Sequence, residues 1–282
     1  MKVVDLPQGR LGNAIFRYLA STLFCIVYGA ERSIKVHEAN YSVSDELFIQ
    51  FMNAKLAGID FIIERNTNYI FNGYYQHDLI YQTFKNEIIL HIVNNPNDKL
   101  ITVGIHEPYQ REVFFSTDLI YTNKKIPKYD VVVHLRLEDF ITNNSAIHPK
   151  SIKDVLDKIG KTGYCFVVNE LKTEVERKYV EYFRKYYDVV IESNDIITDY
   201  HIMKNANILV CQCSTISWAA ALMSHTITRV YLPNYKNQRV HEGRYWETLS
   251  SPVENTIGYD YEICSQSSLE EFLNSQELVN VT

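Results

Sequence analysis

One stretch decides the fold of this 282-residue chain: Lys128-Tyr-Asp-Val-Val-Val-His-Leu-Arg-Leu-Glu-Asp-Phe140. Its three consecutive valines predict a buried parallel strand, which ends by presenting His134 and Arg136. A guanidinium at the end of a buried strand is desolvated, and a phosphate is an anion that fits its fork. Ligands of open α/β sheets bind outside the carboxyl ends of the strands, so the stretch predicts an anion site. The alternative is an ion pair between Arg136 and a neighbouring carboxylate such as Asp139.

Around this strand, the second half of the chain alternates strands and helices. Strands are expected at residues 130–135, 164–168, 188–192, 207–211 and 229–232. The clearest helix spans Leu171 to Tyr187, with apolar side chains at helical spacing. A last helix is expected to begin at a capping box of Ser268 and Glu271. This alternation predicts a doubly wound parallel sheet.

The first half begins with a strand–loop–helix–strand signature. Its elements are expected at Lys2–Leu6, Pro7–Gly12, Asn13–Tyr28 and Ile34–His37, with Gly29 ending the helix. Two further helices, Asp45–Leu56 and Leu79–Val93, flank an aromatic segment at Tyr69–Tyr75. The polar, basic and proline-containing residues Tyr121 to Lys128 are the predicted hinge.

Four motifs resemble those of the α-1,2-fucosyltransferases, glycosyltransferase family 11. His134, Arg136, Asp139 and Phe140 match the family's His-x-Arg-Arg-Gly-Asp-Tyr. The other three are Gly9-Arg-Leu-Gly-Asn13 with Phe16 and Tyr18, Gly73-Tyr-Tyr-Gln76, and Ser214-Thr-Ile-Ser-Trp218 with Ala221. They are similar to the family's Gly-Arg-Leu-Gly-Asn-Gln-Met-Phe-Gln-Tyr, Gly-Tyr-x-Gln and Ser-Thr-Phe-Ser-Trp-Trp-x-Ala. The departures from the family are Leu137 for the second Arg, Glu138 for Gly, Ala14 for Gln and Ala219 for the second Trp.

The resemblance implies a GT-B-type α/β fold, in which two Rossmann-like domains face a cleft. An acceptor-side domain is expected at 1–122 and a nucleotide-sugar-binding domain at 128–244, with 245–282 packing back towards the N-terminal domain. The implied activity is inverting, metal-independent transfer of L-fucose from GDP-fucose to a glycan hydroxyl. The alternatives are another 6-deoxyhexose nucleotide donor, such as a rhamnose donor, and a catalytically silent glycan- or nucleotide-binding protein.

Such a transfer places negative charge on the departing diphosphate, so a cation must face it. Arg136 is the expected cation. Ser214 and Thr215 follow the strand 207–211 and open a helix, whose N-terminus is suited to phosphate. The alternative is that Ser214 is an ordinary N-cap.

The resemblance also suggests that Asp199 lies on a helix bordering the guanine site, and a solvated helix aspartate is the alternative. Asn13 is expected to reach donor or acceptor, and Gly12, like Gly9, lets the backbone approach closely. Asp139 and Glu138 are the nearest candidates for the catalytic base, with Glu138 expected to point to solvent. His134 is expected to orient the loop.

Many glycosyltransferases hold a metal ion with Asp-x-Asp, which this sequence lacks. We therefore expect no metal, and no cofactor beyond GDP-fucose as donor substrate. Cys211-Gln-Cys213 has no second Cys/His pair, so its thiols are expected to be buried. Five cysteines without a disulfide-like spacing fit a reducing compartment.

A net charge of −6 gives no reason to expect nucleic acid as a partner. The expected partners are a nucleotide sugar and a glycan acceptor. The apolar run Tyr18 to Tyr28 is too short to span a bilayer and lacks a basic flank and a cleavage site. We therefore expect no targeting segment and no stable membrane insertion, as in a cytoplasmic enzyme of a bacterium or of a virus-infected cell.

Overall fold

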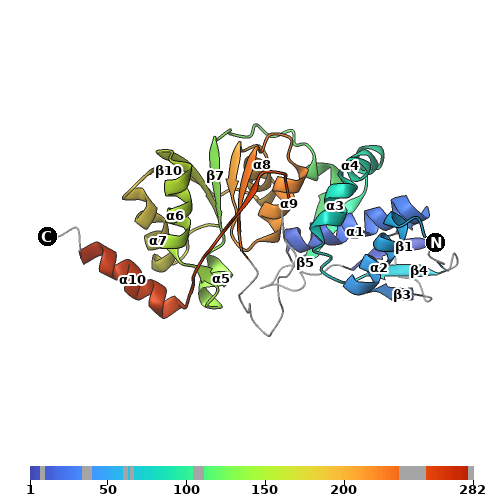
Figure 1. Cartoon of the computed structure of the whole chain (residues 1–282), viewed down its shortest axis with the longest axis horizontal. Helices are drawn as coiled ribbons and strands as arrows, with labels where there is room; N and C mark the ends of the chain where they lie inside the picture. Colours follow the sequence, from blue (N-terminus) through green and yellow to red (C-terminus); the bar gives the residue numbers. More distant parts are fainter. Residues whose placement is uncertain are drawn as a thin grey trace. The chain divides into compact units, whose positions relative to one another are not determined.

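The computed structural model describes residues 1–6, 10–33, 40–59, 63, 67–103, 111–234 and 252–278. The chain divides into two compact units, Met1–Asn123 and Lys124–Thr282 (Figure 1). The division falls within the Tyr121–Lys128 segment where a hinge is predicted. Gly9, the predicted strand Ile34–His37 and residues 235–244 of the expected nucleotide-binding domain lie outside the described residues.

A six-stranded parallel sheet forms the centre of the second unit, in the spatial order β10-β9-β7-β11-β12-β13. Its strands are β7 (Val131–Leu135), β9 (Gly163–Val168), β10 (Asp188–Glu192), β11 (Ile208–Val210), β12 (Arg229–Pro233) and β13 (Thr256–Tyr259). Numbered along the chain, this order is 3-2-1-4-5-6, which is the order of dinucleotide-binding Rossmann sheets. The predicted parallel α/β sheet is confirmed, with β13 as an additional edge strand.

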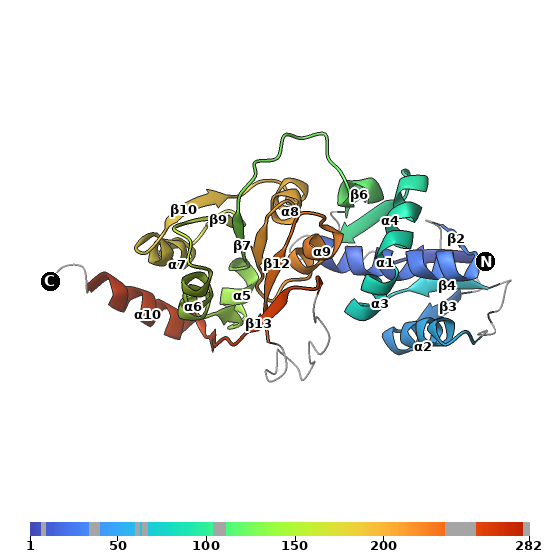
Figure 2. The ribbon, with the colours of Figure 1, turned by 45° about the horizontal axis from the view of Figure 1, so that its top comes forward.

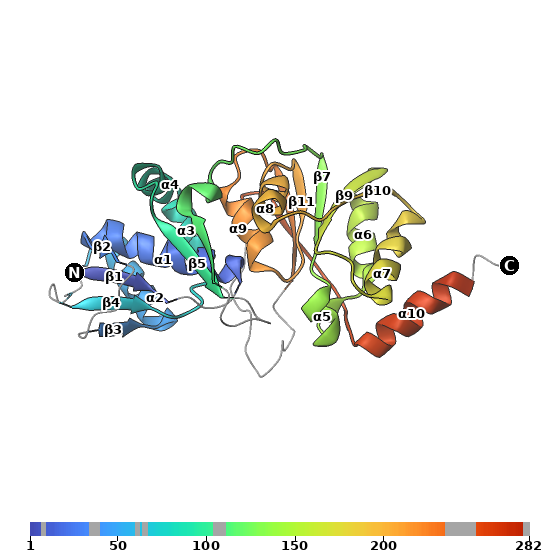
Figure 3. The same cartoon turned by 180° about the vertical axis from the view of Figure 1, so that it is seen from behind.

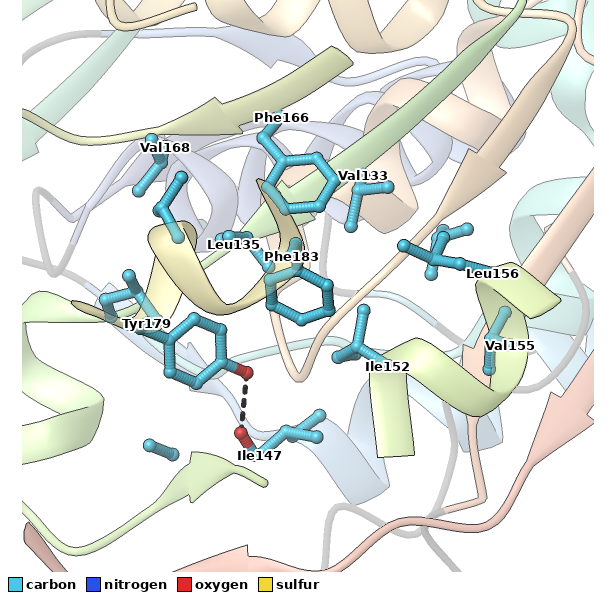
Figure 4. Close-up of a cluster of buried hydrophobic side chains, with 14 of the residues drawn as sticks. Val133, Leu135, Ile147, Ile152, Val155, Leu156, Phe166, Val168, Tyr179 and Phe183 are labelled. Atoms are coloured by element: carbon cyan, nitrogen blue, oxygen red, sulfur yellow. Dashed lines mark hydrogen bonds between the residues drawn. The ribbon is translucent and has the colours of Figure 1, made fainter. Parts of the chain in front are cut away.

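Helices cover both faces of this sheet (Figure 2). On one face lie α6 (Pro149–Ile159) and α7 (Glu174–Arg184), and on the other lie α8 (Ile196–Lys204) and α9 (Thr215–Met223). Apolar side chains of α6 and α7 meet those of β7 and β9 in one core cluster, which includes Leu156, Phe166 and Phe183 (Figure 4). The local sequence sets the start of α7: Thr173 and Glu176 form a capping box, so the helix begins at Glu174, three residues inside the predicted range.

The C-terminal segment belongs to the second unit in its described residues, which corrects the expectation that it packs back towards the N-terminal domain. β13 pairs with β12, β14 (Ile263–Cys264) pairs with β8 (Ala146–Ile147), and α10 (Gln266–Leu278) packs on α7. The physical reason is burial, because Leu269 and Leu273 complete the core beside α7. The predicted capping box is also wrong: α10 begins earlier, and the Ser265 hydroxyl accepts a hydrogen bond from the Ser268 N–H at 3.2 Å.

The first unit is built on a smaller parallel sheet in the order β2-β1-β4-β3 (Figure 3). Its strands are β1 (Lys2–Asp5), β2 (Glu31–Arg32), β3 (Asn40–Val43) and β4 (Asn68–Phe71). The other elements are α1 (Leu11–Tyr28), α2 (Asp45–Leu56), α3 (Asp78–Thr83), α4 (Lys85–Asn94), the hairpin β5 (Lys99–Val103) and β6 (Arg111–Phe115), and the 3-10 turn η1 (Ser116–Leu119). The predicted bounds of α2 are confirmed, whereas the single helix expected at Leu79–Val93 is interrupted at Phe84.

Helix α1 is long and apolar enough to cross a membrane by length and composition alone, but 78% of it is buried. It packs on β1, β4, β5 and α4. The Phe24 ring meets the rings of Phe51, Tyr69 and Phe71 at 4.9 to 5.6 Å between centroids. The helix ends at Gly29, which adopts a left-handed φ of 65° easily because glycine has no Cβ. The expected core helix is therefore confirmed.

Candidate functional site

The carboxyl ends of β7 and β11 lie side by side at the centre of the six-stranded sheet, where Val133 pairs with Val210. The chain leaves β7 towards β9 on one side and leaves β11 towards β12 on the other. We call the two adjacent strand ends the switch point, since ligands of open α/β sheets bind where the direction reverses. The sheet therefore brings the Arg136 segment next to the segment that opens α9 with Ser214 and Thr215.

The Arg136 guanidinium contacts two side chains of α5 (Glu138–Thr142). Its Nε and Nη2 donate to Oδ1 and Oδ2 of Asp139 at 3.2 and 2.7 Å, and its Cζ lies 4.6 Å from the centre of the Phe140 ring. The alternative ion pair considered from the sequence is therefore present. Nη1 makes no hydrogen bond within the described residues, and the side chain is 21% exposed. A phosphate could bind Arg136 beside Asp139 or in its place.

The two carboxylates of α5 have different surroundings. Asp139 holds the Arg136 guanidinium with both oxygens, so its geometry fits a role in orienting that cation. Glu138 accepts a hydrogen bond from Asn169 Nδ2 at 2.9 Å and lies 3.4 Å from Lys172 Nζ. Its side chain is partly exposed, and these surface contacts tie it to the loop after β9.

His134 is 9% exposed and lies one residue from the end of β7. Burial, and after it the nearby charge of Arg136, lowers the pKa of His134 to about 3. Its buried Nδ1 has no hydrogen-bond partner within the described residues. A general base works best with a pKa near the operating pH, so this neutral imidazole fits the expected structural role better than proton transfer.

Ser214 occupies the N-cap position of α9 without making a side-chain capping hydrogen bond. Its carbonyl accepts hydrogen bonds from Ser217 Oγ at 3.1 Å and from Trp218 N at 3.4 Å. Thr215 is the first residue of the helix, and both hydroxyl residues are buried. The first turn of α9 contains no acidic residue, so no side-chain charge of that turn opposes an anion at the positive end of the helix dipole.

Gln212 is the residue of this site that sequence reasoning missed. It is 1% exposed, and its Oε1 accepts a hydrogen bond from the Arg136 backbone N–H at 2.6 Å. Its backbone carbonyl accepts another from the Ser214 N–H at 2.7 Å. In the sequence, Gln212 is marked only by its position between two cysteines. Its contact with Arg136 forms because β7 and β11 are neighbours in the sheet.

Asp199 lies in α8 and is buried, so the alternative of a solvated aspartate is wrong. Its Oδ1 accepts hydrogen bonds from the backbone N and from Nδ2 of Asn194, both at 3.1 Å. Burial raises the pKa of Asp199. These hydrogen bonds hold Asn194, in the loop after β10, against α8. That Asp199 borders a guanine site stays a prediction.

Gly12 and Asn13 belong to the first unit, where they form part of the first turn of α1. Gly12 is buried in that turn, and Asn13 is partly buried. The expected reach of Asn13 to a donor or acceptor sugar stays a prediction.

The five cysteines are free and buried, as expected for Cys211 and Cys213. Burial raises the pKa of the Cys211 thiol to about 12, so it is protonated at neutral pH. The Cys213 thiol lies 3.7 Å from the Tyr261 hydroxyl. Within the described ranges, no group of three His, Cys, Asp or Glu side chains could hold a metal ion.

The switch point thus combines a guanidinium with a helix N-terminus on adjacent parallel strands. A guanidinium and a helix N-terminus are both groups that bind anions. No protein-family model, no curated protein and no solved structure matches this chain.

Proposed function

We propose that this protein is an inverting, metal-independent glycosyltransferase that transfers L-fucose from GDP-fucose to a glycan hydroxyl on a GT-B-type scaffold. The observation that carries the proposal is the junction of Arg136 with the N-terminus of α9 at the switch point. The resemblance of four motifs to α-1,2-fucosyltransferases supports the choice of donor. The five buried free thiols fit an enzyme of a reducing cytoplasm, bacterial or in a virus-infected cell.

In the proposed reaction, the bond between the anomeric carbon of fucose and the β-phosphate oxygen breaks as the acceptor oxygen attacks from the opposite face. The bonding electrons leave with the diphosphate, whose growing charge is met by Arg136 and by the first turn of α9. One preorganised donor of this kind contributes about 2.7–4 kcal/mol to transition-state stabilisation. The acceptor proton passes to a base or to the leaving phosphate.

The core accounts for the single arginine of this motif. Leu137, which stands where the family has its second Arg, is buried in the cluster that also holds Ile141 and Leu135. Position 137 therefore contributes to packing, and Arg136 is the cation that this motif offers to the diphosphate. Asp139 would orient Arg136 from one side, while the Phe140 ring supports its flat face.

A thermal-shift panel of GDP, UDP and dTDP tests the choice of nucleotide. A ligand at 100 times its dissociation constant stabilises a protein by about 2.7 kcal/mol, so GDP should raise the melting temperature clearly. A shift with dTDP alone would favour a different deoxyhexose donor, and binding of GDP without any transfer would favour a silent binding protein. No shift with any of the three would contradict the proposed function.

The second test concerns metal ions. Because the sequence contains no Asp-x-Asp pair, transfer should survive excess EDTA and should gain nothing from Mg²⁺ or Mn²⁺. A strict requirement for either ion would mean that the diphosphate binds elsewhere.

A further inference from the structure

Gln212 connects the two anion-binding groups of the switch point. A buried primary amide must have its oxygen and nitrogen satisfied by the protein. The Gln212 side chain binds the Arg136 backbone N–H at 2.6 Å, and its main-chain carbonyl binds the Ser214 N–H at 2.7 Å. One residue therefore fixes both the start of the Arg136 loop and the start of α9.

The hydrogen bond between the Arg136 N–H and the Gln212 side chain lies just beyond the last paired residues of β7. The pairing of β7 with β11 ends at Val133 and Val210, and the pairing of β7 with β9 ends at Leu135. Arg136 is the next residue, so its N–H lies just beyond the ladder. The Gln212 amide oxygen takes the place of a neighbouring strand there and sets the direction in which the chain leaves β7.

The other end of the amide is also anchored in the core. Nε2 of Gln212 lies 3.5 Å from the Tyr179 hydroxyl, which donates to the carbonyl of Ile147 at 2.7 Å (Figure 4). Tyr179 comes from α7 and is completely buried. The amide is therefore supported from a second element, as preorganised sites require.

We propose that Gln212 is a positioning residue that holds Arg136 and the N-terminus of α9 in the geometry that binds the donor diphosphate. This inference rests on the proposed function. Arg136 is then fixed twice, by Gln212 at its main chain and by Asp139 at its guanidinium. Such double support lowers the reorganisation that diphosphate binding and transfer require.

The experiment compares Gln212→Met, which keeps the length of the side chain and removes both polar atoms, with the wild-type protein. Calorimetric titration with GDP and with inorganic pyrophosphate should show affinity falling about 10-fold for both, and transfer falling up to about 100-fold, because small misplacements of catalytic groups have effects of this order. Ser224→Ala is the matched control: it removes a buried hydroxyl that binds the Lys204 carbonyl at 2.6 Å, just past the opposite end of α9. The control should lose stability and keep both affinities.

Tyr179→Phe carries the test if Gln212→Met does not fold. It should weaken pyrophosphate binding by less than Gln212→Met does, because its support of Arg136 is indirect, whereas Tyr164→Phe, which removes a buried hydroxyl bound to the Leu156 carbonyl, should not weaken it. Wild-type affinity in folded Gln212→Met, or equal affinities in the two tyrosine variants, would overturn the role of Gln212 and leave the proposed function standing. Wild-type protein that binds neither GDP nor pyrophosphate would overturn both.

Discussion

Arg32 in the first unit and Arg136 in the second are both arginines at the end of a parallel strand beside a carboxylate, but their surroundings differ. Arg32 forms a close ion pair with Asp5, lies 3.2 Å from Asp98 and donates to Thr22 Oγ1 at 2.6 Å. Its side chain is 11% exposed. Burial lowers the pKa of Arg32, but the charges around it, led by Asp5, outweigh burial and raise the pKa overall.

Arg136 has one carboxylate partner within the described residues, and one terminal nitrogen makes no hydrogen bond there. An arginine surrounded by partners on several sides has no capacity for a ligand and serves the scaffold. An arginine with one partner and a donor left over is suited to bind an incoming anion. The number of partners, rather than charge or burial alone, separates the two roles.

The largest effect expected from this comparison is on stability. Arg32→Met leaves Asp5 and Asp98 without their cation and should lower the free energy of unfolding by about 3–5 kcal/mol, as for other broken buried ion pairs. Urea unfolding measures the change. Lys2→Met is the control, because the ion pair of Lys2 with Glu31 is exposed and should matter little. Equal losses of unfolding free energy in the two variants would contradict a structural role for Arg32.

Arg136→Ala should affect activity much more than stability. Transfer should fall by at least about 10²–10³-fold, with most of the GDP affinity, because the diphosphate loses its cation. Arg136→Lys should restore little, since an ammonium cannot replace the planar fork. The free energy of unfolding should change far less than in Arg32→Met. Turnover close to that of the wild type in Arg136→Ala would disprove the mechanism.

A smaller effect should sharpen the site further. Thr215→Val keeps the side-chain volume and removes one proposed hydrogen bond to a charged phosphate, which should weaken GDP binding by about 1.5–3 kcal/mol.

Asn13→Ala in the first unit should instead lower the transfer rate with little change in GDP affinity. Titration calorimetry and initial rates separate the two. Loss of GDP affinity in Asn13→Ala alone would move the nucleotide site to the first unit.

The last prediction concerns pH and His134. Its pKa is about 3 in the folded protein and about 6.5 in the unfolded chain, so below pH 6.5 the unfolded state binds a proton that the folded state rejects. His134 should therefore make stability fall as the pH drops from 6.5 towards 3, by at most about 1.4 kcal/mol per pH unit. His134→Gln should show a shallower acid slope in urea unfolding. The same slope in both proteins would mean that His134 is not neutral and buried.

Local sequence was sufficient for several secondary elements. Three valines gave β7, the residues Asp45–Leu56 formed α2 as predicted, and Gly29 ended α1 because it accepts a left-handed φ. Each of these features depends on residues within a few positions of one another. The burial of Cys211 and Cys213 was expected from the chemistry of the free thiol.

The strand order and the site depended on tertiary structure. The C-terminal segment joined the second unit because β13 and α10 find their partners there, and no local pattern encodes a partner. Arg136 meets Gln212 across 76 positions of sequence. By itself, the sequence determined that an arginine ends a buried strand and that hydroxyl residues open a helix. Only the packing of β7 against β11 placed these groups together, because hydrogen bonds between distant segments form only once the sheet has set their register.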